Sequence, residues 1–174
     1  MSKVVLVGSS IFAQWERASH GFIGHHVKNC AIGGTTSEHW LKLLIGVLDN
    51  EAPDALCFYC GSNDFNLEIP DDQIIENVLS LFDQAKAYRS DLPLAYWGII
   101  KAPQKMNKWD RIDVVNSRIM KGLQDIDYYV DTNKIFFLKS RVRSHFFIED
   151  QLHLTKEAYE HMNSLGRQIL TGWL

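Results

Sequence analysis

The fold is decided near the start of the chain by residues 3–10, which read KVVLVGSS. The four aliphatic residues at positions 4–7 form a short apolar run, which is typical of a β-strand buried on both faces. The run stops at Gly8, and glycine directly after a strand favours a tight turn. Two hydroxyl side chains, Ser9 and Ser10, therefore follow the end of a buried strand.

The same pattern continues along the chain, where short apolar runs alternate with longer amphipathic segments. The apolar runs predict strands at residues 3–7, 27–32, 55–60, 94–100 and 128–130. Apolar residues at helical spacing predict four helices. The first is capped by Ser37, the second begins at Asp71 and Asp72, the third includes Ile112 to Ile126, and the last is capped by Thr155. Apolar strands that alternate with helices indicate a parallel sheet covered on both faces. We therefore predict an α/β fold, a three-layer α/β/α sandwich around a five-stranded parallel sheet.

Length and composition limit the class of protein. A chain of 174 residues is long enough for one domain with a hydrophobic core, so we expect a single domain over residues 1–174. Hydrophobic residues make up 46% and charged residues 22% of the chain, which is typical of a soluble globular protein. The net charge of -3 gives no attraction to nucleic acid, and no apolar run approaches the ~18 residues of a membrane span. The start of the chain does not read as a signal peptide, which favours a cytoplasmic location.

The three cysteines, Cys30, Cys57 and Cys60, do not suggest a disulfide framework. The last two have the spacing of a redox or zinc half-site, but they lie in an apolar run that predicts a strand. Side chains three residues apart on a strand point to opposite faces of the sheet. We therefore interpret this pair as buried core residues.

Polar residues that can perform chemistry gather where the predicted strands end. Residues 8–10 (GSS), 33–36 (GGTT) and 61–64 (GSND) follow the first three strands, and residues 150–153 (DQLH) precede the last helix. In an open parallel sheet, ligands bind at the carboxyl ends of the strands, so we expect all four segments at one edge. Together they supply a hydroxyl, backbone amides beside glycine, an amide side chain and an acid–imidazole pair.

Acyl transfer requires these groups. A serine hydroxyl is a weak nucleophile until a base takes its proton, so Ser10 is the candidate nucleophile and His153 the candidate base. Asp150 lies three residues before His153, close enough to hold the tautomer of its imidazole and stabilise the imidazolium. The backbone amides of Ser10 and Gly34 and the side chain of Asn63 are candidate donors to an oxyanion.

These segments resemble a known family. In order, residues 8–11 (GSSI), 33–35 (GGT), 61–64 (GSND) and 150–155 (DQLHLT) resemble the four blocks of the SGNH (GDSL-type) hydrolases. The resemblance spans nearly the whole chain. It implies a flavodoxin-like fold and esterase, lipase, thioesterase or carbohydrate deacetylase activity without a metal.

By position, the resemblance assigns the nucleophile to Ser10, the oxyanion donors to Gly34 and Asn63, and the rest of the triad to Asp150 and His153. Two positions depart from the family pattern. Ser9 stands where the family usually has aspartate, and Ala158 where it often has glycine. Neither position belongs to the triad, so the chemistry is expected to survive.

Each motif also has a simpler interpretation. A Gly-Ser-Ser sequence after a strand is typical of a plain turn or of a phosphate-binding loop. Ser9 is the neighbouring alternative to Ser10 as nucleophile, Asn63 is a common turn residue, and His153 is also placed to cap the last helix. The combination of Ser10 with Asp150 and His153 favours the catalytic interpretation.

Two irregular stretches, residues 101–108 and 133–145, are predicted to be surface loops near the same edge of the sheet. The first carries Lys101, Lys105 and Lys108. Solvated lysines are the simpler interpretation of this loop, and contact with substrate is the alternative.

We therefore predict a hydrolase that cleaves short-chain acyl or acetyl esters, including esters on carbohydrate or lipid, through an acyl-enzyme on Ser10. The expected partner is a small-molecule ester, and no cofactor, metal, nucleic acid or membrane span is expected. The short chain leaves little room for a lid, so an open site is expected. Two alternatives share this fold: acyl transfer to an alcohol by the same triad, and a non-catalytic ligand-binding module.

Overall fold

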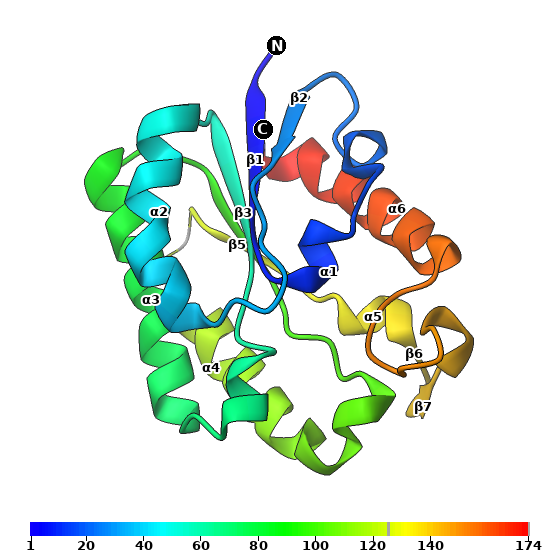
Figure 1. The fold of residues 1–174 in the computed structure, drawn as a ribbon. Helices are drawn as coiled ribbons and strands as arrows, with labels where there is room; N and C mark the ends of the chain where they lie inside the picture. Colours follow the sequence, from blue (N-terminus) through cyan, green and yellow to red (C-terminus); the bar gives the residue numbers. More distant parts are fainter. Residues whose placement is uncertain (125, 174) are drawn as a thin grey trace.

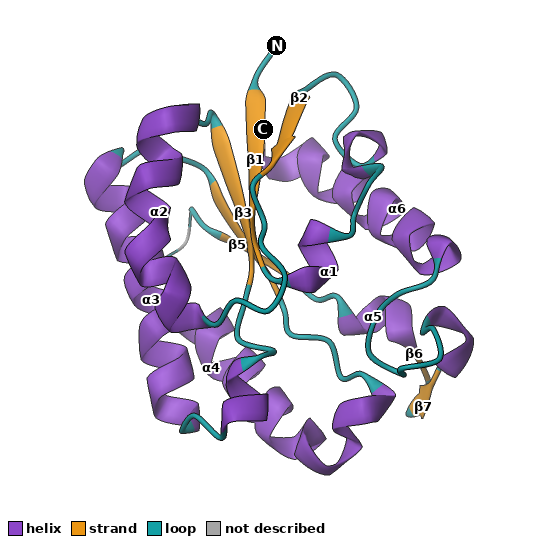
Figure 2. Cartoon of the chain, in the orientation of Figure 1, coloured by secondary structure: helices purple, strands orange, loops and turns teal. Residues whose placement is uncertain are grey.

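A computed structural model describes residues 1–124 and 126–173 of the chain. Its main sheet has five strands in the order β2-β1-β3-β4-β5, and every neighbouring pair is parallel (Figure 2). The strands are β1 (Lys3–Gly8), β2 (His26–Asn29), β3 (Ala55–Tyr59), β4 (Leu94–Trp97) and β5 (Tyr128–Val130). The five-stranded parallel sheet predicted from the apolar runs is confirmed.

Helices cover both faces of the sheet, as the three-layer prediction requires. They are α1 (Ser10–Ala13), α2 (Ser37–Glu51), α3 (Asp71–Tyr88), α4 (Trp109–Gly122), α5 (Asn133–Phe136) and α6 (Lys156–Trp173). In Figure 1, α2, α3 and α4 lie on one side of the sheet, and α1, α5 and α6 lie on the other. No helix among the described residues has the length and apolarity needed to cross a bilayer.

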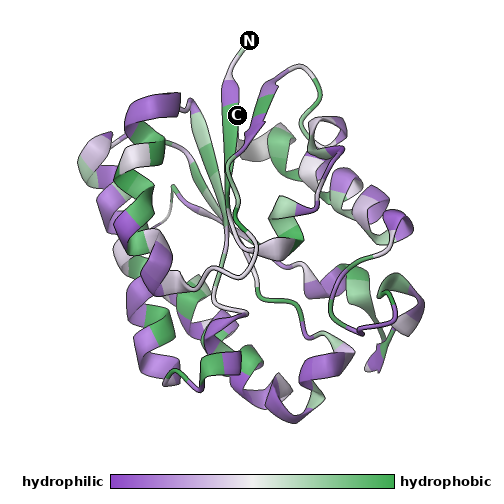
Figure 3. Cartoon of the chain, viewed as in Figure 1, coloured by the Kyte–Doolittle hydropathy of each residue, from purple (hydrophilic) through white to green (hydrophobic). Residues whose placement is uncertain are grey.

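Alternate side chains of the central strands enter two separate cores. Val4 and Leu6 pack in the cluster beside α1 and α6, whereas Val5 and Val7 pack in the cluster beside α2, α3 and α4. This division follows from the two-residue period of a strand. In Figure 3 the central strands are largely hydrophobic, while the helices alternate between hydrophobic and hydrophilic residues. Burial on both faces explains why the strands read as continuous apolar runs.

The start of α2 differs from the prediction that Ser37 is its cap. The helix begins at Ser37, and the N-cap is Thr36, whose hydroxyl accepts from the backbone amide of His39. The His39 ring nitrogen accepts in return from the Thr36 amide, which completes a capping box. Either hydroxyl residue suits a cap locally, but the Ser37 hydroxyl has a distant partner, Asp64, at 2.5 Å.

Three other boundaries also differ from the sequence pattern. β4 ends at Trp97, since the backbone amide and carbonyl of Ile99 both bond the side chain of Asn116. Helix α4 ends at Gly122, so Ile126 lies outside it and is exposed. The predicted loop 133–145 contains helix α5 and a small hairpin of β6 (Phe137–Leu138) and β7 (Arg141–Val142).

Candidate active site

The turn after β1 places Ser10 at the carboxyl edge of the sheet. Gly8 pairs with Tyr59 of β3, and the Ser9 amide donates to the Tyr59 carbonyl at 2.9 Å. The φ angle of Gly8 is 140°, and a Cβ atom there would lie 1.9 Å from the Tyr59 carbonyl oxygen. Only glycine fits this close approach of two central strands. The chain can then turn at once into α1, which begins at Ser10.

The structure brings Ser10, His153 and Asp150 into one chain of hydrogen bonds. His153 Nε2 lies 3.0 Å from Ser10 Oγ, although the two residues are 143 positions apart. On the other side of the ring, His153 Nδ1 lies 2.6 Å from Asp150 Oδ2. Asp150 Oδ1 also accepts from the backbone amides of Leu152 and His153, at 2.9 Å each. The short turn thus orients the carboxylate towards the ring of the same segment.

This geometry fixes the charge of Asp150. The hydrogen bond from the His153 ring is the main cause that lowers the pKa of Asp150 to about 2, and the two backbone amides add to it. The carboxylate is therefore ionised near neutral pH and accepts a hydrogen bond from the N–H group at Nδ1. With the hydrogen on Nδ1, Nε2 carries the lone pair and can accept the Ser10 proton.

The segment that carries Asp150 and His153 is held at both ends. Phe147 and Leu154 form an isolated antiparallel bridge, and the Ile148 amide donates to the His153 carbonyl at 2.9 Å. At the tip of the turn, the Gln151 carbonyl accepts from the Gln104 amide at 3.0 Å. The segment is therefore tied both to itself and to the loop after β4.

The structure does not favour the two alternative interpretations, in which Ser9 is the nucleophile or His153 caps the last helix. Ser9 is buried, and its hydroxyl has no partner among the described residues, so it lies apart from the His153 ring. His153 does not cap α6, because the Thr155 hydroxyl accepts from the Ala158 amide at the helix start. Of the two serines, only Ser10 bonds His153.

The predicted oxyanion donors come from the two neighbouring loops. A Cβ atom on Gly33 would lie 4.0 Å from the Ser10 Cβ, so the second loop lies beside Ser10. Within the described chain, the backbone amides of Ser10 and Gly34 donate to no protein acceptor. Asn63 donates one amide hydrogen to the Thr35 carbonyl at 2.9 Å. This bond ties the third loop to the second and leaves the other Asn63 hydrogen available.

A buried polar network beneath these loops was not predicted. Asp64 is 1% exposed, and its carboxylate accepts from both the backbone amide and the hydroxyl of Ser37. Asn77 of α3 donates to the same hydroxyl at 2.9 Å. Burial raises the pKa of Asp64, while its bonds from Ser37 act in the opposite direction. The network joins the Asn63 loop to the first residue of α2 and to the second turn of α3.

The loop after β4 is less exposed than the lysine pattern suggests. The prediction of a solvated loop is wrong for Lys105, which is 2% exposed and donates to Asn66 Oδ1 at 2.5 Å. The neighbouring Lys108 bonds the Phe65 carbonyl and Glu68. Both lysines belong to the 3₁₀ helix Pro103–Lys108, and both hold the 3₁₀ helix Asp64–Leu67, which follows Asn63. The loop therefore packs against the segment that positions Asn63.

The burial of Lys105 predicts an unusual pH dependence of stability. Burial is the main cause that lowers the pKa of Lys105 to about 8, and the positive charge of Lys108 adds to it. The unfolded chain keeps this amine protonated up to a pH of about 10. Between these values the unfolded chain binds more protons, so the contribution of Lys105 to the free energy of unfolding rises with pH.

We expect the native protein to gain stability relative to Lys105→Met as the pH rises from about 8 to about 10. Urea unfolding gives the free energy of unfolding of both proteins at each pH. Subtracting one value from the other cancels the contributions of the other titrating groups. The exposed Lys121 of α4 gives a control, because Lys121→Met should show no such trend. A relative stability that stays constant or falls over this range would contradict a buried amine at position 105.

Taken as chemistry, the site presents a hydroxyl aligned with an imidazole and an ionised carboxylate, beside free amide hydrogens. Such an array can deprotonate the hydroxyl and stabilise an oxyanion next to it. Among the residues that the structure describes, no group of three or more His, Cys, Asp and Glu side chains has the arrangement of a metal site.

Comparison with known proteins gives one family. The family model described as GDSL-like lipase/acylhydrolase matches residues 7–161. Among curated proteins, none matches the chain.

Several solved structures share the fold of this chain. A lipase/acylhydrolase from Enterococcus faecalis has a TM-score of 0.82 at 20% identity, covering 99% of this chain and 96% of its own. A GDSL-like lipase from Bacteroides thetaiotaomicron has a TM-score of 0.80 at 22% identity, covering 98% and 88%. The Clostridium thermocellum family 3 carbohydrate esterase has a TM-score of 0.75 at 15% identity, covering 96% and 94%. At these identities the likeness shows a common fold.

Proposed function

The chain belongs to the GDSL-like lipase/acylhydrolase family, and from this membership we propose that it hydrolyses carboxylic esters with Ser10 as the nucleophile. One observation carries the proposal: Ser10 Oγ lies 3.0 Å from an imidazole whose other nitrogen lies 2.6 Å from the carboxylate of Asp150. The same three residues were predicted from the sequence as nucleophile, base and acid. The esterases and acylhydrolases among the similar folds favour the same class of reaction.

In the proposed acylation step, Ser10 Oγ attacks the carbonyl carbon of the ester while His153 Nε2 takes the hydroxyl proton. Asp150 remains ionised and stabilises the imidazolium that forms. The carbonyl oxygen becomes an oxyanion, which accepts hydrogen bonds from the amides of Ser10 and Gly34 and from Asn63. When the tetrahedral intermediate collapses, the alcohol leaves with the proton from His153.

In the proposed deacylation step, water attacks the acyl group on Ser10 and gives a proton to His153 Nε2. Collapse of the second tetrahedral intermediate returns this proton to Ser10 Oγ and releases the carboxylic acid. No cofactor takes part in this scheme. The side chains of Asp150 and His153 are 42% and 22% exposed, so water reaches the reacting groups. An exposed site of this kind suits short acyl groups or esters on larger polar molecules.

Removal of the Asn63 side chain tests the proposed oxyanion site. We expect Asn63→Ala to lower kcat by ~10²–10³-fold, which is the usual loss for one oxyanion donor. KM should change little, because the donor acts mainly on the charged intermediate. Steady-state kinetics measure both values. Gln124→Ala, at an exposed amide beyond α4, is the control. A rise in KM with kcat unchanged would argue that Asn63 binds the substrate in its ground state.

The proposed function is tested with a panel of p-nitrophenyl esters of increasing acyl length, beside acetylated sugars and acyl-thioesters. We expect turnover of short esters and a burst of p-nitrophenol equal to the enzyme concentration when deacylation is slow. A fluorophosphonate probe should label the native protein and should fail to label Ser10→Ala. Product analysis with an added acceptor alcohol separates hydrolysis from acyl transfer. A protein that cleaves none of these esters and takes no label would contradict the proposal.

A further inference from the structure

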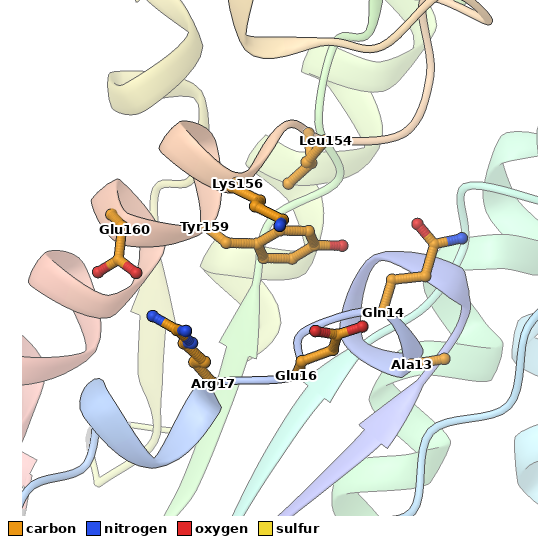
Figure 4. Close-up of a pocket in the computed structure, with 8 residues that line it drawn as sticks. All are labelled: Ala13, Gln14, Glu16, Arg17, Leu154, Lys156, Tyr159 and Glu160. Atoms are coloured by element: carbon orange, nitrogen blue, oxygen red, sulfur yellow. The ribbon is translucent and has the colours of Figure 1, made fainter.

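A pocket lies between α1 and the start of α6. Its volume is about 550 Å³, which is in the range of pockets that hold small ligands. Figure 4 shows its residues, with the ring of Tyr159 at the centre. The pocket is lined by Ala13, Gln14, Glu16, Arg17, Leu154, Lys156, Tyr159 and Glu160.

The pocket is built from the two segments that carry the proposed reacting residues. Ala13 lies three residues after Ser10 in the same helix, which is about 5 Å along the helix axis. Leu154 directly follows His153, so their Cα atoms are about 3.8 Å apart. Tyr159 closes the space between these segments, because its hydroxyl donates to the Ile11 carbonyl at 2.8 Å. A group held in this pocket therefore lies against the segments that carry Ser10 and His153, although the side chains of these two residues are not part of its lining.

The lining carries four charges that the fold does not pair. Glu16, Arg17, Lys156 and Glu160 form no ion pair with any described residue. Glu160 accepts one bond, from Asn163, while no described residue bonds the charged groups of the other three. In Figure 4 the four charged ends spread around the Tyr159 ring. Two cations and two anions balance, so the pocket offers donors and acceptors without a net charge.

This chemistry selects one class of ligand. Sugar hydroxyls both donate and accept hydrogen bonds, so they can satisfy carboxylates and cationic groups together. The half-buried face of Tyr159 adds an apolar surface for the C–H face of a sugar ring. An acyl chain would instead remove the charged groups from water without replacing their hydrogen bonds, which is unfavourable. We propose that the pocket binds the sugar of an esterified carbohydrate, the alcohol part of the substrate.

The inference rests on the proposed ester hydrolysis and is tested with two substrates. The kcat/KM of Arg17→Ala and of Glu160→Gln is measured on a monoacetylated methyl glucoside and on p-nitrophenyl acetate. We expect each variant to lose about tenfold on the sugar ester, mainly through KM, as for the loss of one hydrogen bond to a charged group. Activity on p-nitrophenyl acetate should stay within about twofold, since its aromatic alcohol part carries no hydroxyl groups for the charged side chains to bond. Glu157→Gln is the matched control, because Glu157 is an exposed residue of α6 that does not line the pocket.

A measurement that needs no turnover keeps the two proposals apart. Saturation-transfer NMR of methyl glucoside on the Ser10→Ala protein should show binding, and Arg17→Ala in the same background should abolish it. If each variant loses kcat/KM equally on both substrates, or if neither variant loses any, the sugar pocket is overturned. Turnover of p-nitrophenyl acetate by the native protein would still support the hydrolase. A protein that binds methyl glucoside but cleaves no ester would overturn the hydrolase and leave the pocket as a sugar site. Absence of sugar binding by the Ser10→Ala protein overturns the pocket proposal.

Discussion

Replacing Ser10 with alanine should lower the turnover of every ester that the protein cleaves by at least ~10³-fold. The change deletes the one oxygen that lies 3.0 Å from His153 Nε2 and leaves the backbone of α1 in place. Alanine is a good helix former, and the freed imidazole is partly exposed to water, so the fold should persist. Steady-state rates and thermal unfolding of the two proteins measure both parts of this expectation.

Ser9→Ala is the matched control for this substitution. Ser9 precedes Ser10, is buried, and has a hydroxyl without a partner among the described residues. Removal of an unpaired buried hydroxyl should leave turnover within a few-fold and should not lower the stability. If Ser9→Ala abolishes turnover or fluorophosphonate labelling while Ser10→Ala does not, the nucleophile is Ser9.

The second large effect is expected from Asp150→Asn, which should lower kcat by ~10³–10⁴-fold. The amide has nearly the shape of the carboxylate and keeps an oxygen for the Leu152 and His153 amides. Its NH₂ group, however, faces His153 Nδ1, where the carboxylate accepted a hydrogen. The ring then accepts at Nδ1 and carries its hydrogen on Nε2, so it can no longer take the Ser10 proton.

The neighbouring Glu149 gives the control for the loss of a charge. Glu149→Gln removes an exposed carboxylate one residue away and should leave kcat nearly unchanged. A loss of equal size in both variants would mean that the overall field of the loop matters rather than the bond to the ring. A third comparison uses stability: because the pKa of Asp150 is about 2, its carboxylate and the hydrogen bonds that it accepts keep their full stabilising effect above pH ~4. The stability difference between native protein and Asp150→Asn should therefore shrink only as the pH falls from ~4 through about 2.

Much of the fold follows from local signals in the sequence. A buried strand such as β1 is an uninterrupted apolar run, and a glycine such as Gly8 marks the place where it ends. In a parallel sheet these ends share one edge, so the order of strands and helices is enough to gather the four polar segments. The candidate triad could be predicted for this reason, since its members lie at recognisable ends of elements.

The interactions that hold the site could not be predicted in the same way. Asp64 and Ser37 are 27 positions apart, and Lys105 and Asn66 are 39 apart. Nothing in the local pattern distinguishes a serine that caps a helix from one that bonds a distant carboxylate, or an exposed lysine from a buried one. These outcomes depend on the packing of one loop against another, which the spacing of residues within each loop does not record.

The distance in sequence between Ser10 and His153 has a consequence for biosynthesis. A chain made from its amino end exposes the hydroxyl early, but its imidazole partner, 143 positions later, belongs to the segment that introduces α6. In the nascent polypeptide, Ser10 therefore lacks its imidazole partner until the segment with His153 has left the ribosome. For the same reason, a protein cut between β5 and α5 should be silent as two pieces and regain function only when they meet, which suits it to use as a split reporter.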